Sequence, residues 1–239
     1  MKVDLFIPCF VDQMRPETAF NMIKVLEKAG CQVSYDVNQT CCGQPAFNAG
    51  FWDEAREVGE KLLNEVPNNK TLVSPSASCV GMIRNSYDLL FQNSSYHNKY
   101  HQLKKKTFEL SEFLVDVLKI TDFGSMLYGK ATYHDSCSAL RECKIKTQPR
   151  ELLKNVKGLE LVEMKDTETC CGFGGSFAVK FEPISVSMTE QKVENAMATG
   201  AEYIISTDYS CLLQMDSYIK KKNLPIKILH IADVLAQGL

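Results

Sequence analysis

The sequence lacks several features that would indicate a membrane protein or a nucleotide-binding enzyme. None of its apolar runs reaches the roughly 18 residues that a membrane-spanning helix needs, so no membrane span is expected. The net charge is only −2, and the lysine triplets at 104–106 and 220–222 are not interleaved with aromatic residues, so no nucleic-acid partner is expected. The G-x-G-x-x-G spacing of dinucleotide-binding loops is also missing, although GFGGS occurs at 172–176.

The first ten residues, MKVDLFIPCF, lack the marks of a secretory signal. They contain one lysine, an aspartate inside a short apolar run and no small-residue cleavage site. A cytoplasmic location is therefore expected. Cysteine, in contrast, is abundant, with ten residues in the chain. In a reducing compartment that number indicates metal or redox chemistry rather than a disulfide framework.

Most of the cysteines belong to a pattern that occurs twice. The tetrapeptide TCCG stands at 40–43 and again at 169–172. In the first copy, 31 residues separate the leading cysteine from the cysteine pair, and 35 residues separate the glycine from the last cysteine. In the second copy these spacings are 32 and 38. The repeated positions are Cys9, Cys41, Cys42 and Cys79 in the first copy and Cys137, Cys170, Cys171 and Cys211 in the second.

The segments that flank the cysteines also align, which indicates an internal duplication. KVDLFIPCF at 2–10 aligns with KATYHDSCS at 130–138, and FELSEFLVDVL at 108–118 aligns with LHIADVLAQGL at 229–239. We therefore expect two lobes related by a pseudo-twofold axis, one over residues 1–122 and the other over residues 123–239.

The hydrophobic pattern predicts alternating strands and helices. Strands are expected at 3–8, 32–37, 71–74, 159–164 and 203–206, and helices at 16–29, 51–66, around 151 and at 185–199. Such alternation is typical of the α/β class, with a small parallel sheet and flanking helices in each lobe. The repeated cysteines follow the carboxyl ends of the predicted strands, the edge at which open parallel sheets bind ligands.

The adjacent cysteines suit ligands better than a disulfide. Neighbouring Cα atoms lie about 3.8 Å apart, closer than a relaxed disulfide normally allows. The glycine that follows each pair permits a sharp turn, which directs both thiols inward. Zinc sites usually take cysteines as C-x-x-C, but Ser76 and Asp208 stand three residues before Cys79 and Cys211. From spacing alone, an iron–sulfur cluster is favoured over zinc.

The duplicated Cys…Cys-Cys-Gly…Cys pattern resembles the cysteine-rich CCG-domain family. Its members include the cysteine-rich component of heterodisulfide reductase, the iron–sulfur component of glycolate oxidase and lactate-utilisation proteins. The two-repeat length and the segments SPSASCVGMIR and HDSCSALRE are most similar to the lactate-utilisation members. The resemblance covers essentially the whole chain.

The resemblance implies an iron–sulfur protein that works with iron–sulfur partner subunits to oxidise L-lactate to pyruvate. It implies one or two [4Fe-4S] clusters per chain, held by the eight repeated cysteines. In the heterodisulfide reductase component, five cysteines, two of them in a Cys-x-x-Cys, hold a noncubane cluster. Ser76 and Asp208 depart from that pattern, which favours a four-cysteine cluster here.

Two alternatives from other functional classes remain open. One is a thiol–disulfide oxidoreductase, and the other is a zinc- or iron-binding scaffold without turnover. Among the remaining candidates, Cys31 is expected to be a structural thiol. Cys143 and His134 are possible additions to the second site, His134 as a ligand or as a hydrogen-bond donor to cluster sulfur. His230 is expected at the surface or at a helix end.

Overall fold

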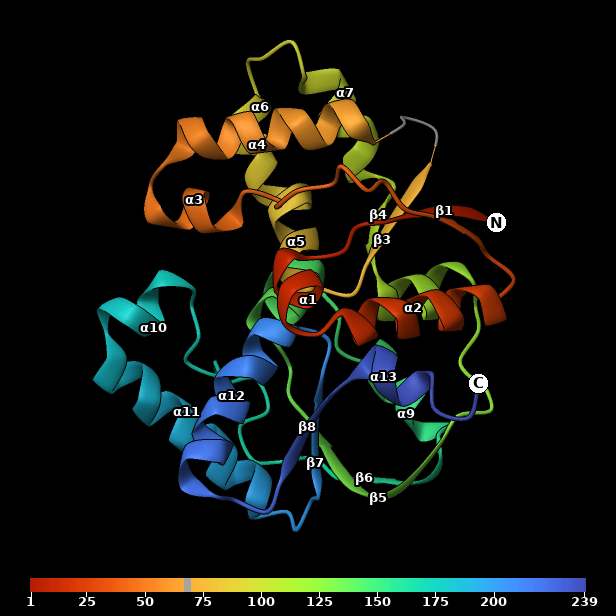
Figure 1. Ribbon diagram of the computed structural model, residues 1–239, viewed down its shortest axis with the longest axis vertical. Coiled ribbons are helices and arrows are strands. Elements are labelled where there is room, and N and C mark those ends of the chain that lie inside the picture. Colours follow the sequence, from red (N-terminus) through yellow and green to blue (C-terminus); the bar gives the residue numbers. More distant parts are fainter. Residues whose placement is uncertain (67–69) are drawn as a thin grey trace.

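The computed structural model describes residues 1–66 and 70–239, which form two four-stranded sheets with flanking helices (Figure 1). Every strand pair in both sheets is parallel. The first sheet has the order β2 (Gln32–Ser34), β1 (Lys2–Leu5), β3 (Thr71–Ser74) and β4 (Thr107–Glu109). The second has the order β6 (Lys157–Leu161), β5 (Met126–Tyr133), β7 (Tyr203–Ser206) and β8 (Lys227–His230).

The helices follow the strands in the same sequence in both lobes. Those of the first lobe are α1 (Cys9–Met14), α2 (Pro16–Lys28), α3 (Gln44–Ala49), α4 (Trp52–Glu65), α5 (Ala77–Gly81), α6 (Tyr87–Phe91), α7 (His97–Lys104) and α8 (Leu110–Glu112), with π-helical segments η1 (Met82–Ser86) and η2 (Phe113–Val117). Those of the second are η3 (Ser138–Cys143), α9 (Gln148–Lys154), α10 (Ser176–Lys180), α11 (Glu182–Met197), α12 (Tyr209–Lys222) and α13 (Ile231–Leu235).

The expectation of an α/β fold with two similar lobes is confirmed, because the two sheets have the same strand order and direction. The division of the chain between residues 122 and 123 stays a prediction. The predicted strands and helices occur within a few residues of their expected ends. Three strands are missing from the predicted set: β5 and the fourth strand of each sheet, β4 and β8. Strands β4 and β8 are short, and each runs directly into a helix.

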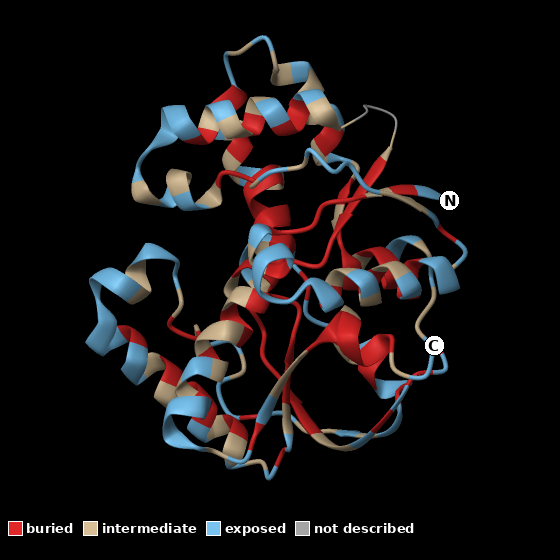
Figure 2. Ribbon diagram, in the orientation of Figure 1, coloured by how far each residue is buried: buried red, intermediate tan, exposed pale blue. Residues whose placement is uncertain are grey.

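Local sequence explains the elements that lead to the cysteines. Helix α2 begins with Pro16, whose fixed φ suits the first helical position, and it buries Met22, Val25 and Leu26 against the first sheet and α13. Strand β3 is buried along its whole length, as expected for a strand with neighbours on both sides in a parallel sheet (Figure 2).

The last helices of each lobe pack against the other lobe. Helix α13 of the second lobe packs against α2 of the first, and α8 and η2 of the first lobe pack against α9 of the second (Figure 1). Asp233 on α13 accepts hydrogen bonds from Thr18 Oγ1 at 3.1 Å and from Asn21 Nδ2 at 3.0 Å. One hydrophobic core therefore contains residues of both lobes, which fixes the two sheets relative to each other. No helix within the described residues has the length and apolar character to cross a membrane.

Candidate metal centre

The repeated cysteines of each lobe meet at the carboxyl edge of its sheet. In the first lobe, Cys9 begins α1 after β1, the pair Cys41–Cys42 precedes α3, and Cys79 lies in α5 after β3. In the second lobe, Cys137 precedes η3, the pair Cys170–Cys171 lies between β6 and α10, and Cys211 lies in α12 after β7. We call these two four-cysteine groups site 1 and site 2.

The thiols within site 1 form a connected chain of contacts. Cys42 and Cys79 are buried, and their Sγ atoms lie 3.5 Å apart. Cys42 and Cys9 hydrogen-bond to Cys41, which holds the pKa of Cys41 far below that of an ordinary thiol and raises the pKa of both partners. One thiolate is therefore already favoured without a metal.

Site 2 repeats this arrangement residue by residue. The pKa of Cys170 is lowered by hydrogen bonds from Cys137 and Cys171, whose own pKa values are raised by the same contacts. Cys171 and Cys211 are buried, as their counterparts are in site 1. The duplication has thus preserved the thiol geometry as well as the spacing.

The glycine after each pair supplies a backbone hydrogen bond to sulfur. The Gly43 N–H donates to Cys41 Sγ at 3.4 Å, and the Gly172 N–H donates to Cys170 Sγ at 3.4 Å. Both glycines have left-handed φ values, +85° and +91°. At Gly172 a Cβ atom would also overlap the carbonyl oxygen of Ser185. Glycine is therefore required both by the turn and by the packing.

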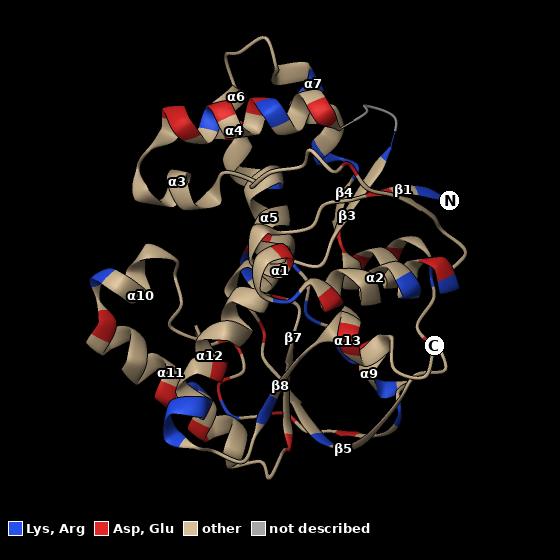
Figure 3. Cartoon of the chain, viewed as in Figure 1, with Lys and Arg blue, Asp and Glu red and all other residues tan. Residues whose placement is uncertain are grey.

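Sites 1 and 2 open into one cavity of about 620 Å³ that lies between the lobes, and all eight repeated cysteines line it. Helices α3 and α10 border it from opposite lobes and contact each other (Figure 1). We call this cavity the cleft. Its described lining residues include no lysine, arginine or histidine, and α3 carries no charged residue (Figure 3).

The floor of the cleft is a buried carboxylate network that joins the lobes. Asp208 is 2% exposed and accepts hydrogen bonds from Ser76 Oγ at 2.7 Å, Ser78 Oγ at 2.8 Å and Ser136 Oγ at 2.8 Å. Burial raises the pKa of Asp208, and these hydrogen bonds oppose that shift. Ser76 and Asp208 occupy equivalent positions of the two repeats. Ser76 and Asp208, which stand where the first cysteine of a C-x-x-C would be, therefore hydrogen-bond to each other across the two lobes.

A second pair of equivalent residues, Glu109 and His230, caps the last helix of each lobe. The Glu109 carboxylate accepts from the Ser111 N–H at 2.8 Å and also from the hydroxyl of Thr207 in the other lobe. His230 Nδ1 accepts from the Ala232 N–H at 3.1 Å, and Nε2 donates to the Pro75 carbonyl of the other lobe at 2.8 Å. The expectation of a surface or helix-end His230 is half right, since the residue caps a helix and is buried.

The structure also locates three further residues that the sequence analysis considered. Cys31 lies in the hydrophobic core, as expected. Cys143 is also buried, in a small cluster with Ala77, Val80 and Ala139, where its thiol donates to the Ala77 carbonyl at 3.5 Å. Cys143 is not among the residues that line the cleft, and whether it joins site 2 stays a prediction. His134 is fully buried beside two of the thiols of site 2.

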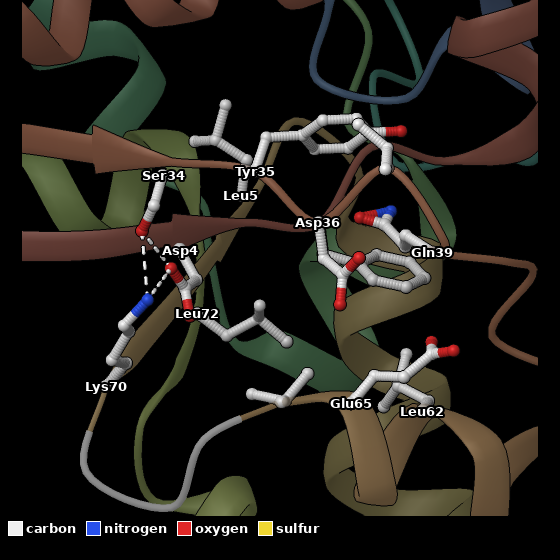
Figure 4. Close-up of a pocket in the computed structure, with 13 residues that line it drawn as sticks. Asp4, Leu5, Ser34, Tyr35, Asp36, Gln39, Leu62, Glu65, Lys70 and Leu72 are labelled. Carbon is white, nitrogen blue, oxygen red and sulfur yellow. Dashed lines mark hydrogen bonds and ion pairs between the residues drawn. The ribbon is translucent and has the colours of Figure 1, made fainter.

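Another cavity, of about 300 Å³, lies in the first lobe between the sheet and the end of α4 (Figure 4). Lys70 Nζ lies 2.7 Å from Asp4 Oδ1 and 3.2 Å from Ser34 Oγ. These contacts satisfy the ammonium group within the wall of the cavity.

The donor set of each site fits a metal group bound by thiolates. Two thiolates on one tetrahedral metal ion with 2.3 Å metal–sulfur bonds lie about 3.8 Å apart, close to the 3.5 Å between the Sγ atoms of Cys42 and Cys79. Four soft thiolates suit zinc or iron–sulfur clusters and not hard cations such as magnesium. The N–H groups aimed at sulfur are of the kind that tunes iron–sulfur clusters.

Comparison with known proteins agrees with the repeat. A family model described as "Cysteine-rich domain" (CCG) matches residues 3–84 and again 131–216. A solved structure titled as a hypothetical protein from Helicobacter pylori aligns with all of this chain at a TM-score of 0.58 and 11% identity, and this chain spans 49% of that one. That likeness supports the fold alone.

Curated relatives match over almost the whole length. Lactate utilization protein A of Halalkalibacterium halodurans is 42% identical over 98% of this chain and 96% of its own length. The proteins of the same name from Geobacillus sp. and Bacillus pumilus are 42% and 41% identical, each over 98% of this chain and 99% of the relative. The chain therefore belongs to the cysteine-rich CCG family, in the group of its members that includes lactate utilization protein A.

Proposed function

We propose that this chain is an iron–sulfur component of L-lactate oxidation to pyruvate, and that it transfers electrons through cysteine-bound clusters in a complex with partner subunits. The observation that carries the proposal is the pair of four-thiol sites that open into one cleft. The relatives named lactate utilization protein A support the pathway. We propose one [4Fe-4S] cluster per site and a cytoplasmic location.

The residues of the sites would hold and tune the clusters. The eight repeated cysteines would bind the irons, and the Gly43 and Gly172 N–H groups would donate hydrogen bonds to ligand sulfur. Bound clusters supply reversible one-electron transfer. Burial of Cys42, Cys79, Cys171 and Cys211 keeps water from the inner side of each site, which protects it from hydrolysis and oxidation.

The charge of the cleft supports a role for partner subunits. The described lining contains Asp208 and Glu142 together with eight thiols, and it offers no cationic side chain to a substrate carboxylate. Lactate carries a negative charge, so its binding there would be opposed by the carboxylates and thiolates. We infer that lactate loses its electrons on a partner protein and that the cleft receives them.

The rim of the cleft provides a surface on which a partner protein can dock. Val179 on α10 lines the cleft and is 84% exposed. Phe51, Trp52, Phe181 and Ile184 are also exposed and lie at the starts of α4 and α11, next to α3 and α10. Exposed apolar groups of this kind are typical of protein interfaces.

The test is metal analysis followed by reconstitution. Prepared without oxygen, the chain is expected to be brown and to contain iron with acid-labile sulfide. Lactate-dependent dye reduction is expected only after the partner subunits are added, and Cys171→Ser should abolish it. Stoichiometric zinc in an anaerobic, iron-replete preparation would contradict the cluster, and robust lactate oxidation by the homogeneous chain would contradict the role of the partners.

A second candidate function is thiol–disulfide chemistry on a small thiol substrate. It is favoured by the low pKa of Cys41 and Cys170, because a thiolate in an open cavity is the nucleophile of such reactions. Reduction of a disulfide substrate with a reduced viologen as electron donor distinguishes this function from electron transfer alone. A metal-binding scaffold, the remaining alternative, predicts bound metal without a reversible redox signal.

A further inference from the structure

His134 occupies a place in the second lobe that a phenylalanine fills in the first. It follows β5, whereas Phe6 stands at the aligned position after β1. Two backbone hydrogen bonds fix its position, because its N–H donates to the Ile205 carbonyl at 2.8 Å and its carbonyl accepts from Ser206 Oγ at 3.0 Å. The side chain is fully buried.

Among the residues that the structure describes, the imidazole of His134 has no hydrogen-bond partner at either nitrogen. Burial of a polar group without a partner is costly in proteins, so such groups are rare and call for an explanation. Hydrophobic Phe6 shows that the fold accepts an apolar ring at this place. Packing alone therefore does not account for histidine.

The unpartnered imidazole lies among the thiols of site 2. A ring nitrogen of His134 and the Sγ atoms of Cys171 and Cys211 all lie within 4.8 Å of one another, and all three residues are buried. Neutral imidazole is the form that binds metals.

We propose that His134 is a metal ligand of site 2, where it joins the cysteines through a ring nitrogen, whereas site 1 binds its metal group through cysteine alone. The inference deepens the proposed function, since it rests on a metal group in each site. It makes the two sites chemically unequal although their thiols are arranged alike.

The inequality should be visible in the reduction potential. Ligand identity and the surroundings of the cluster set the potential of an iron–sulfur centre. A histidine ligand in site 2 alone should therefore give the two sites different midpoint potentials.

The experiment uses the full-length chain with site 1 disabled by Cys42→Ser, loaded with iron and sulfide without oxygen. Pulsed EPR of the reduced protein is expected to show a strongly coupled nitrogen, which His134→Phe removes. A redox titration is expected to show a different midpoint potential in His134→Phe from that of the parent. His134→Cys supplies a thiolate at the same place and is expected to retain iron while the nitrogen signal is lost.

His101→Phe serves as the matched control, because it removes a histidine from α7, whose residues do not line the cleft. It should leave both the nitrogen coupling and the potential unchanged. A loaded site 2 with neither nitrogen coupling nor a potential shift in His134→Phe would overturn the assignment of His134 and leave the cluster proposal intact.

Cobalt(II) alone gives a readout that does not depend on iron. In the Cys42→Ser chain, His134→Phe is expected to weaken cobalt binding by roughly tenfold or more. Absence of iron in every variant would contradict the proposed function, whereas the cobalt titration would still decide the role of His134. Unchanged cobalt affinity would overturn the assignment.

Discussion

Phe6 packs behind the cysteines of the first lobe, and His134 takes the same place in the second. The thiol contacts, the cysteine–glycine turn and the N–H···S hydrogen bonds are alike in both lobes. The comparison shows which parts of the duplicated site are fixed and which are free to vary. The backbone that positions the four thiols is the same in both lobes. The residue packed behind the thiols differs, so the polarity around each site differs too.

The largest expected effect is on metal retention, and it tests whether the two sites load independently. Cys42→Ser should remove the iron of site 1 and Cys171→Ser that of site 2, each lowering total iron by about half. A hydroxyl is a harder and far less acidic ligand than a thiol, so it does not replace the thiolate. Iron and sulfide analysis of the anaerobically loaded chain measures the loss.

Two buried cysteines outside the sites provide the controls. Cys31→Ser and Cys143→Ser should change iron content little, because Cys31 lies in the hydrophobic core and the Cys143 thiol donates to the Ala77 carbonyl. If Cys31→Ser alone strips the iron, the proposed ligand set is wrong. Loss of all iron in both Cys42→Ser and Cys171→Ser would mean that the sites load as one unit.

The glycines offer a sharper comparison of the two turns. A Cβ at Gly172 would overlap the Ser185 carbonyl oxygen, whereas one at Gly43 would lie 3.1 Å from the Ala55 carbonyl oxygen. Both substitutions by alanine strain a left-handed residue, at a cost of about 1–2 kcal/mol. Gly172→Ala should therefore cost more than Gly43→Ala in the free energy of unfolding, and it should also impair iron binding at site 2. Chemical denaturation of both variants, followed by iron analysis, makes the comparison. Equal losses would show that the second turn adjusts as easily as the first.

The last expected effect concerns the helix cap at Glu109, which contacts the other lobe. Burial raises the pKa of Glu109 to about 7, although hydrogen bonds from Ser111 and Thr207 oppose that shift. Between pH 4.5 and pH 7 the folded state therefore holds a proton that the unfolded state has lost. The free energy of unfolding should decrease as the pH rises through this range, by up to about 3 kcal/mol. Denaturation at a series of pH values measures the slope.

Glu109→Gln should flatten that slope because the amide does not titrate. Glu17→Gln, on the exposed surface of α2, should leave it in place. A slope that persists in Glu109→Gln would assign the pH dependence to another buried group, such as Asp208, whose pKa is also raised by burial.

The sequence predicted the repeated architecture because strand periodicity and the cysteine spacing report local geometry. It placed the eight cysteines at the strand ends, and the structure brings them together around one cavity. It did not reveal the Asp208 network or the caps made by Glu109 and His230, because each joins residues of different lobes. The alignment did mark Ser76 and Asp208 as equivalent residues, but their contact depends on how the two sheets are placed, which no local pattern contains.

The packing of the last helices of each lobe against the other lobe has a consequence for biosynthesis. Residues Lys28 and Ile231 are separated by 203 positions (231 − 28). At usual translation rates, about 10–40 s therefore pass between the synthesis of α2 and the start of α13. Until then Met22, Val25 and Leu26 lack part of their cover. All four cysteines of site 1 are therefore synthesised long before the helix that completes the packing of the first lobe. We therefore expect metal loading to follow the synthesis of both lobes, so that a nascent chain exposes its first four thiols without the walls that later enclose them.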